Sequence, residues 1–498
     1  MIGLEPRANQ SFLSRDDVER IHIATLGVLE KTGVIVGDPE CVNLLKESGA
    51  IVDERGLVRF PERIVKEALA SVPSSIRLYA RDSRYDIRLE GQRVHFYGGA
   101  GNVLRVIDLD TGALRAPHNE DIVRFARIAD GLENIHCYGA MTTTVDVPPR
   151  YADFHRWAMT FKNSTKTMID GGSGEVGARV YIDMAASIVG SKEELRKKPL
   201  IAGYGCPVSP LRHPTEELAW LKTFAKEKLP YCTVSEPMMG VTSPATLSGA
   251  MVLMNAENLS SIVISQLFNR GAPVIYGANP YPVDMKTGLV CTASPEGAIA
   301  GAITVELAHF YRLPCQAVCS TNSKLVDAQC GVEKSLMIPC AMAGCNIIGV
   351  EGTIDSSLTA SYEELVLTDE FIGVVYRLMR GIEISDELIA GETIHKVGHG
   401  GHYLSESHTR KYAMTEIWYP KLMDRRHRRE WEKMGAKALD VKARERVREI
   451  LKNHQPEPLE KDVERLIDKI VKEAEKTLAK TPSHSEISTA RPRELNLD

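Results

Sequence analysis

Residues 199–240 read PLIAGYGCPVSPLRHPTEELAWLKTFAKEKLPYCTVSEPMMG, which is a short apolar run, a helix-length segment and a second apolar run. Both runs end in Gly, Ser and Pro, which break regular structure. Nearly continuous apolar runs are typical of parallel strands, because flanking helices bury both faces of a parallel sheet. The stretch therefore predicts a strand, a helix and a second strand parallel to the first.

The same unit recurs along the chain in both directions. The apolar runs, each followed by a helix-length segment, are VHFYGGAG (94–101), IHCYGAMTTT (135–144), TKTMIDGGSG (165–174), PLIAGYGCPVSP (199–210), PYCTVSEPMMG (230–240), APVIYGANP (272–280), LPCQAVCST (313–321) and CNIIGVEGT (345–353). Eight strands close a parallel barrel, so the expected fold is an α/β (β/α)8 TIM barrel. A doubly wound open sheet is the alternative.

The rest of the chain frames this barrel. We expect an N-terminal α+β extension over residues 1–94, the barrel over 95–400, C-terminal helices over 401–480 and a disordered tail over 481–498. Ser14 followed by Asp17 predicts a capped first helix in the extension. The C-terminal helices should pack on the barrel or on a partner subunit, since they carry one apolar stripe.

Composition excludes several classes of protein. The chain has 498 residues and a formal charge of −5 from 61 basic and 66 acidic residues, which is too balanced for binding nucleic acid. It begins with no secretory signal, and no apolar stretch approaches the roughly 20 residues of a membrane span. Its ten cysteines form no CxxC pair. A cytoplasmic protein with reduced cysteines and no membrane partner is expected.

Two motifs suggest other kinds of site. GGSGEVG (171–177) follows an expected strand, and Glu193 and Glu194 lie further on, as in a dinucleotide fingerprint; however, it falls at the third run rather than the first. His399 and His402 flank two glycines, and His408 follows, but no HExxH accompanies them. The expectation is that this chain binds neither a nucleotide nor a metal, and a nicotinamide-dependent oxidoreductase stays an alternative.

Aromatic and carboxylate residues gather at the ends of the expected strands, where barrel enzymes build their active sites. They are Tyr97, Asp170, Tyr204, Glu236, Tyr276 and Glu351, and the amide Asn279 lies among them. A quaternary ammonium donates no hydrogen bond, so aromatic faces and nearby negative charge are what a site offers it. The set therefore predicts a cation pocket, although the tyrosines could also simply pack the top of the barrel.

With these residues in view, the chain resembles the trimethylamine methyltransferase family along nearly its whole length. The resemblance rests on many segments in one order, among them RKKPLIAGYGCPVSPL (196–211), SGAMVLMNAENLSSIVISQL (248–267) and IHKVGHGGHYL (394–404). It implies an enzyme that passes a methyl group from a methylated amine to a corrinoid (cobalamin). The corrinoid would be carried by a separate cognate protein, with no cofactor bound tightly in this chain.

The archaeal trimethylamine enzymes of this family carry pyrrolysine just after the seventh strand, at a position that matches Thr321 or Asn322 here. This departure favours a quaternary amine such as glycine betaine, carnitine or proline betaine over trimethylamine. A quaternary nitrogen already carries the charge that its departure as a neutral amine requires. Two further functions stay open, namely a trimethylamine methyltransferase lacking pyrrolysine and a non-catalytic protein that binds quaternary amines.

Roles follow from this expected function. Glu236 and Glu351 are the expected catalytic residues, because they supply negative potential. The expected substrate-binding residues are Tyr97, Asp170, Tyr204, Tyr276, Asn279, Thr321 and Asn322. The three tyrosines would hold the cation, Asn279 would orient the remaining polar group, and backbone N–H groups of GGAG or GGSG would bind a carboxylate. A homo-oligomer is expected.

Overall fold

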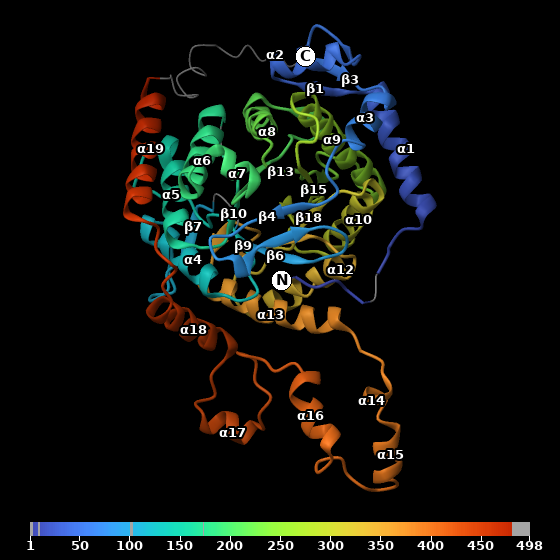
Figure 1. The fold of residues 1–498 in the computed structure, drawn as a ribbon, viewed down its shortest axis with the longest axis vertical. Helices are drawn as coiled ribbons and strands as arrows, with labels where there is room; N and C mark the ends of the chain where they lie inside the picture. The colour runs from blue at the N-terminus through green and yellow to red at the C-terminus, as the bar shows by residue number, and fades with distance from the viewer. Residues whose placement is uncertain (1–2, 8–9, 100–102, 173, 481–498) are drawn as a thin grey trace.

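The computed structural model describes residues 3–7, 10–99, 103–172 and 174–480. Within it, parallel strands close a barrel in chain order: β6 (His95–Gly98), β9 (Cys137–Tyr138), β10 (Thr167–Asp170), β11 (Ile201–Gly205), β13 (Tyr231–Ser235), β15 (Val274–Ala278), β18 (Cys315–Val318) and β19 (Ile347–Glu351). The last strand, β19, pairs with the first, β6. Every expected run is a barrel strand, and the open sheet is excluded (Figure 1).

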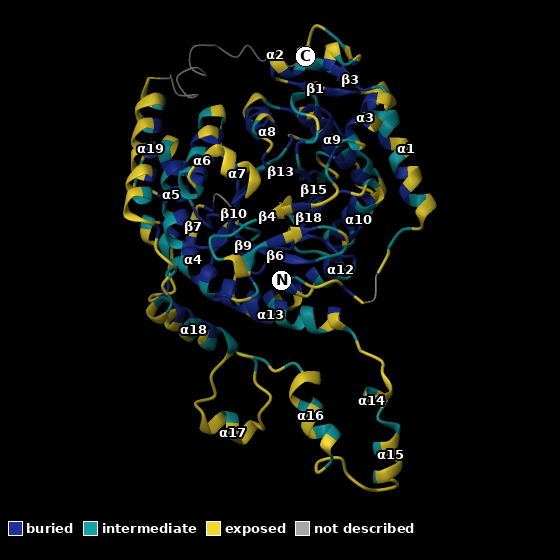
Figure 2. Ribbon diagram, viewed as in Figure 1, coloured by how far each residue is buried: buried dark blue, intermediate teal, exposed yellow. Residues whose placement is uncertain are grey.

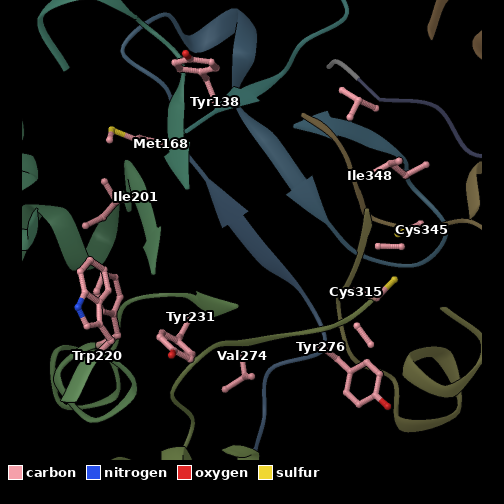
Figure 3. Packing of buried hydrophobic residues seen from close by; sticks show 14 of the residues in the cluster. Tyr138, Met168, Ile201, Trp220, Tyr231, Val274, Tyr276, Cys315, Cys345 and Ile348 are labelled. Atoms are coloured by element: carbon pink, nitrogen blue, oxygen red, sulfur yellow. The ribbon is translucent and has the colours of Figure 1, made fainter. Parts of the chain in front are cut away.

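Helices wrap the barrel, and side chains on the outer face of the strands pack against them. The helices that alternate with the strands are α4 (Asn119–Gly131), α5 (Ala152–Asn163), α6 (Gly174–Val189), α8 (Thr215–Glu227), α9 (Leu247–Phe268), α10 (Pro295–Tyr311), α12 (Met337–Met342) and α13 (Tyr362–Arg380). Figure 3 shows part of this outer core, including Trp220, Tyr231 and Tyr276. Among the described helices α9 is long and apolar enough to cross a membrane, but 72% of its apolar window is buried inside the protein, as in a core helix.

The interior of the barrel is a second core. Successive side chains on a strand face opposite sides, so Cys232, Ile275 and Ile347 face inward while their neighbours face the helices. The hairpin of β4 (Ile76–Leu78) and β5 (Ile87–Leu89) adds its apolar side chains to this cluster. The hairpin therefore plugs the barrel where its strands begin, and a cavity lies near their carboxyl ends.

Strand-end loops build two small sheets beside the mouth of the barrel. One contains β7 (Arg105–Ile107), β8 (Leu114–Arg115), β20 (Thr353–Ile354) and β21 (Thr359–Ala360); the other contains β14 (Met238–Met239), β16 (Tyr281–Asp284) and β17 (Leu289–Val290). These sheets come from the loops after β6 and β19 and from those after β13 and β15. They give the mouth ordered walls in place of irregular loops.

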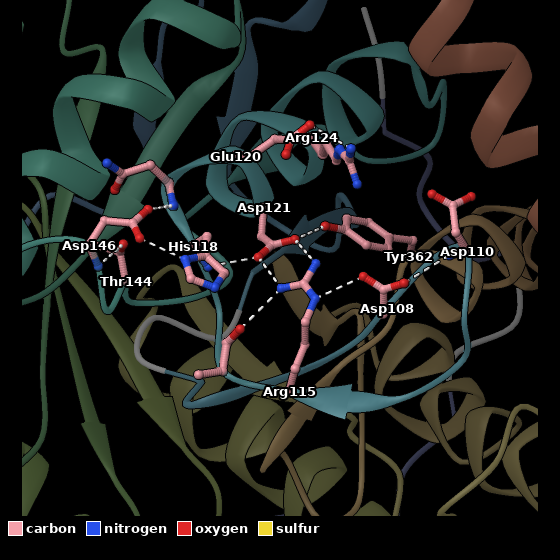
Figure 4. A network of polar contacts seen from close by, with 12 residues as sticks. Asp108, Asp110, Arg115, His118, Glu120, Asp121, Arg124, Thr144, Asp146 and Tyr362 are labelled. Atoms are coloured by element: carbon pink, nitrogen blue, oxygen red, sulfur yellow. Dashed lines mark hydrogen bonds and ion pairs between the residues drawn. The ribbon is translucent and has the colours of Figure 1, made fainter.

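A polar network fastens the first of these sheets to the helix layer (Figure 4). Arg115 contacts Asp108 at 2.8 Å and Asp121 at 2.7 Å, and the Tyr362 hydroxyl donates to Asp121 at 2.5 Å. Burial on its own would raise the pKa of Asp121, but the hydrogen bonds from Arg115 and the His118 N–H outweigh it and lower the pKa overall. The ionised carboxylate thus ties β8 to α4 and α13.

The N-terminal extension packs on the helix layer and on a strand-end loop. It comprises α1 (Arg15–Lys31), β1 (Val34–Val36), α2 (Pro39–Glu47), β2 (Ile51–Val52), β3 (Leu57–Arg59), α3 (Glu62–Leu69) and, beyond β4, the short helix η1 (Ser83–Tyr85). Ser14 caps α1 as expected, in a capping box with Asp17. β1 pairs in parallel with β12 (Arg212–His213), which follows β11. The extension is therefore fixed to the barrel through a shared sheet.

The C-terminal part both wraps the barrel and projects from it. It contains α14 (Asp386–Ile389), α15 (Gly391–Val397), α16 (Ser407–Glu416), α17 (Arg428–Lys433), α18 (Leu439–Asn453) and α19 (Lys461–Ala479). α18 packs on α13 and α4, and α19 packs on α5 and α6. The segment that carries α14 to α16 projects from the body (Figure 1), and the boundary expected at residue 401 falls inside it, between α15 and α16. The expected disordered tail, 481–498, lies outside the described residues.

Candidate active site

A cavity of about 470 Å³ lies at the carboxyl ends of the barrel strands. Its lining residues are Tyr97, Gly99, Arg156, Asp170, Gly171, Gly172, Tyr204, Glu236, Tyr281, Thr292, Gln316, Val318, Glu351 and Ser357. Five of the residues expected at the site, Tyr97, Asp170, Tyr204, Glu236 and Glu351, are among them. Tyr204, Glu236 and Glu351 are half-buried, so the cavity opens to solvent.

Three tyrosines give the cavity an aromatic wall. The Tyr97 hydroxyl donates to the Ile169 carbonyl at 3.1 Å, and the Tyr204 hydroxyl donates to Glu236 Oε1 at 3.3 Å. Tyr281 joins them from β16. Gly139 makes room for the first ring, since a Cβ there would lie 2.3 Å from the Tyr97 hydroxyl oxygen. Burial raises the pKa of all three phenols, so they stay neutral.

Two glutamates supply the negative charge. Glu236 follows β13, and its Oε1 accepts a hydrogen bond of 2.8 Å from Asn279 Nδ2. Burial raises the pKa of Glu236, and the nearby Glu351 carboxylate raises it further. Glu351 accepts from the hydroxyls of Thr353 at 2.9 Å and Ser357 at 2.6 Å. Its backbone φ of 52° is strained for a residue with a side chain, a state found most often at functional sites.

Asp170 has a different role from these glutamates. Arg156, which is fully buried, places Nη1 2.8 Å from each Asp170 oxygen. Burial raises the pKa of Asp170, and the Arg156 charge opposes this rise. The N–H groups of Ala140 and Gly171 also donate to Asp170, at 3.0 and 2.8 Å. Arg156 Nε also lies 2.9 Å from Asp153 Oδ1, so its charge is shared by two carboxylates. Glu236 and Glu351, in contrast, form no ion pair among the described residues, and they supply the negative charge that faces the cavity.

Gln316 contributes a hydrogen-bonding group to the cavity without a protein partner among the described residues. Its neighbours Cys315 and Ala317 pack in the outer core, so strand alternation turns Gln316 inward. The side chain is 1% exposed, and its Oε1 accepts from the Cys232 thiol. Its Nε2 has no hydrogen-bond partner in the described chain. A buried donor of this kind costs about 1–3 kcal/mol unless a ligand satisfies it.

Four residues expected at the site lie elsewhere. Tyr276 was expected to hold the cation, but the structure places it on the outer face of β15, where its hydroxyl donates to Asn255 Oδ1 of α9 at 2.8 Å. Asn279 supports Glu236 and accepts from the Val318 N–H at 2.8 Å, so both ends of its amide are engaged.

Thr321 and Asn322 lie behind the wall of the cavity. Thr321 is fully buried and donates to the Thr353 carbonyl at 2.9 Å. Asn322 Oδ1 accepts from the N–H and hydroxyl of Thr292, which itself lines the cavity. Both residues therefore hold neighbouring loops in place and do not face the cavity directly.

The glycine-rich loops serve the barrel and carry no dinucleotide fingerprint in space. Gly171 and Gly172 line the cavity, but Glu193 and Glu194 lie in α7 (Lys192–Lys197), after α6 has run back along the barrel, and pair with Lys197. The N–H groups of Gly99 and Gly171 are taken by Glu351 and Asp170. Ala100, Gly101 and Ser173 of the expected carboxylate-binding loops lie outside the described residues. Within the described chain no group of His, Cys, Asp and Glu could hold a metal ion, and His399, His402 and His408 belong to the projecting segment.

Sequence reasoning missed Tyr281, Gln316, Arg156, Thr292 and Ser357. Gln316 had a signal, because it is the lone polar residue inside the run LPCQAVCST before its terminal Ser and Thr, and it occupies an inward position. Tyr281 comes just after the sixth run, in a loop that only the structure folds back over the mouth through β14 and β16. Arg156 belongs to a helix, where no pattern in the sequence points to the barrel mouth.

Comparison with known proteins places the chain among methyltransferases. Residues 4–479 match the family described as trimethylamine methyltransferase (MTTB). Trimethylamine methyltransferase MttB of Desulfitobacterium hafniense is 32% identical over 93% of both chains, and MttB2 of Methanosarcina mazei is 34% identical over 94% of this chain and 95% of its own. A glycine betaine methyltransferase of Desulfitobacterium hafniense is 30% identical over 93% of this chain and 96% of its own. The crystal structure of the Methanosarcina barkeri monomethylamine methyltransferase shares the fold, with a TM-score of 0.50 and 12% identity over 95% of this chain and 90% of its own.

Proposed function

The chain belongs to the trimethylamine methyltransferase family and is therefore a methyltransferase, and we propose that it takes its methyl group from a quaternary amine and passes it to a corrinoid protein. The observation that carries the substrate class is the pairing of Tyr97, Tyr204 and Tyr281 with Glu236 and Glu351 in one cavity. A quaternary ammonium is recognised by aromatic faces and by negative charge, with no hydrogen bond from the cation. The nicotinamide alternative loses its basis, because Glu193 and Glu194 lie away from the glycine loop.

The reaction asks little of the protein beyond binding and orientation. The reduced cobalt of a corrinoid supplies the electron pair for the new bond to the methyl carbon. The C–N bond breaks with its electrons passing to nitrogen, so a cationic substrate leaves as a neutral tertiary amine and needs no general acid. The tyrosines and glutamates hold the cation, and the cavity walls fix which methyl faces the mouth. No residue has to accept a proton.

The substrate's other end meets Gln316. Because Glu236 and Asn279 already satisfy one another, Asn279 is not free to bind the polar group of the substrate. The unpartnered Nε2 of Gln316 is a buried donor that the cavity offers to a hydroxyl or carboxylate oxygen. We therefore assign to Gln316 the orienting role first expected of Asn279.

Gln316→Leu is expected to raise KM for a quaternary amine bearing an oxygen about 10-fold, since a hydrogen bond to a buried donor is worth about 1–2 kcal/mol. Tetramethylammonium, which has no oxygen, should show less than a twofold change. Steady-state kinetics of both substrates with wild type and variant measure this. An equal loss for both substrates would contradict the role.

A ring of exposed apolar side chains around the mouth supports docking of a protein partner. Seven of the eight strand-end loops carry at least one in the described chain: Leu104, Val145, Val208, Val241, Met285, Leu289, Leu325 and Leu358, between 46% and 68% exposed. Apolar residues gathered on one face mark an interaction surface. A corrinoid protein seated on this ring would bring its cofactor directly over the cavity, which fits a cofactor held by the partner and not by this chain.

Asp at Leu104, Val241 and Met285 together is expected to raise KM for the corrinoid protein at least about 10-fold, because charges replace apolar contacts in the interface. With free cobalamin as acceptor the same variant should keep wild-type rates. Ile23 and Ile51 are similarly exposed but lie in the N-terminal extension, so Asp at these positions is the matched control. Equal losses with both acceptors would argue against the ring as the docking site.

A demethylation screen tests the function itself. Glycine betaine, carnitine, proline betaine, choline and trimethylamine are each incubated with the enzyme and free Co(I) cobalamin, and the demethylated amine is measured by mass spectrometry. Turnover of at least one quaternary amine, with none of trimethylamine, is the expected result. Turnover of trimethylamine alone would overturn the substrate class, and binding without turnover would favour a sensor of quaternary amines.

The remaining features of the proposal concern where and how the protein works. We propose a cytoplasmic enzyme that functions as an oligomer of identical chains. No disulfide joins its ten cysteines in the described chain, which fits a reducing compartment. The oligomer is supported by uncovered apolar surface in the C-terminal part.

A further inference from the structure

A segment of the C-terminal part stands away from the barrel, and no other part of the described chain covers it. We call residues 382–414 the arm; it contains α14, α15 and the start of α16 (Figure 1). Between residues 381 and 442 no side chain is buried, in contrast to the barrel (Figure 2). The hydrogen bonds and ion pairs of residues 383–412 in the described chain, such as Lys396 with Glu406, stay within the arm. The described hydrogen bonds to the rest of the chain lie at the two ends of the arm, where the Arg7 guanidinium donates to the Ile382 carbonyl and the Tyr419 hydroxyl to the Ala413 carbonyl. The body therefore leaves most of the arm unsupported.

Short helices of this kind do not persist in water without tertiary packing. α14, α15 and α16 have 4, 7 and 10 residues, and isolated helices below about 12–15 residues are marginal. The arm nevertheless carries many large apolar residues, as a segment that packs against a partner does. Its exposed large side chains are Ile382, Ile384, Ile389, Ile394, Tyr403, Leu404 and Met414, from 44% to 85% exposed. This surface needs a partner.

We propose that the arm packs on a second copy of this chain. If a fully exposed large side chain offers roughly 150 Å², the lower end of the range for aromatic residues, these seven expose on the order of 650 Å², which is most of the ~800 Å² per partner of a specific interface. Two copies related by a two-fold axis bury equivalent surfaces, so the arm of each copy is covered by the other copy. The second copy is the one partner present whenever the chain is made.

The position and charge of the arm argue against two other partners, the corrinoid protein and a membrane surface. α13 starts at the mouth and ends at the opposite face, where Tyr376 bonds to the Val94 carbonyl just before β6 and the Met379 carbonyl accepts from the Arg7 N–H. The arm leaves from this closed end, so it is not placed to receive the corrinoid protein over the cavity. It carries five acidic and three basic residues, which does not suit an anionic membrane surface.

Light scattering on the purified full chain tests the proposal. Wild type is expected at twice 55.0 kDa or a higher even multiple, with no other protein present. Ile384→Lys, Ile394→Lys and Leu404→Lys combined should give a 55.0 kDa species, since charges would enter the interface. The control carries Lys at Ile23 and Ile51, which are 60% and 61% exposed, and should keep the wild-type mass.

Two outcomes overturn the proposal: a monomeric wild type, or an arm variant that keeps the wild-type mass. If the arm variant aggregates, hydrogen exchange of wild type at decreasing concentration replaces it. Arm amides are expected to exchange at least about 10-fold faster once the oligomer dissociates, while amides of the barrel strands keep their rates. Arm exchange that is independent of concentration would contradict the inference.

Discussion

Replacing Glu236 with glutamine is expected to lower kcat/KM for a quaternary amine about 100-fold, which corresponds to about 2.7 kcal/mol. The amide keeps the size of the side chain and its contacts with Tyr204 and Asn279 but removes the buried negative charge. A cation in a cavity of low polarity loses more from this change than it would in water. Steady-state kinetics with a saturating corrinoid acceptor measure the effect.

The pH dependence gives the same residue a second signature. Burial raises the pKa of Glu236 above its ordinary value, so the carboxyl is protonated over a wider range and kcat/KM should rise as the pH increases through that raised pKa. A bound cation favours the ionised carboxylate and so lowers its pKa. The rise in kcat should therefore occur at a lower pH than the rise in kcat/KM. In Glu236→Gln both rises should disappear.

Stability should move in the opposite direction from activity. A carboxyl whose pKa is raised by folding is protonated more readily in the folded state, so its ionisation costs stability as the pH rises from the unfolded to the folded pKa. Glu236→Gln removes this cost and is expected to be slightly more stable than wild type at neutral pH. Lost activity with lost stability would indicate a merely structural role.

Tyrosine variants provide the matched control for the site. Tyr281→Leu should lower kcat/KM about 10-fold, since one aromatic face near a desolvated cation is worth roughly 1–2 kcal/mol. Tyr276→Phe should change kcat/KM less than twofold, because the Tyr276 hydroxyl bonds to α9 on the far side of the strand. Similar losses from both would contradict the cavity as the cation site.

The barrel could be predicted because buried parallel strands leave a strong pattern. Each apolar run ends at the residue where the chain must turn, so the eight strands are visible without any long-range information. Glu236 and Glu351 follow from the same rule, since strand ends meet at one face. For Tyr276 the expected side of the strand differs from the observed one. It lies two residues before the end of β15, and successive side chains on a strand point in turn to the helices and to the barrel interior, so a shift of one residue exchanges the two.

Other features depend on contacts that no local pattern contains. Tyr281 reaches the cavity because β14 and β16, more than 40 residues apart, pair beside the mouth. Arg156 reaches it because a buried aspartate on β10 requires a cation nearby. The exposure of the arm could not be predicted either, because its apolar spacing is that of an ordinary surface helix. Its position in the structure shows that the described chain leaves it uncovered.

Lys334→Met is expected to lower the free energy of unfolding by about 3–5 kcal/mol, because it leaves a buried carboxylate without its cation. Lys334 ends α11 (Ala328–Lys334), and its Nζ lies 2.6 Å from Glu364 Oε1 and 2.8 Å from the Val350 carbonyl. Both side chains are fully buried. Burial raises the pKa of Glu364, and Lys334 opposes this rise, so its removal leaves the acid in an apolar site. Urea unfolding at fixed protein concentration measures the loss.

The double variant Lys334→Met with Glu364→Leu separates the charge from the packing. Removing both charges eliminates the unpaired carboxylate, so most of the lost stability should return. The Lys334 contact with Val350, however, supports the residue just before Glu351, which holds its carboxylate at a strained φ of 52°. Activity should therefore stay below wild type even where stability recovers. Full recovery of both activity and stability would mean that the end of β19 is held without Lys334. A double variant as unstable as Lys334→Met would show that packing, and not the pair of charges, dominates at this position.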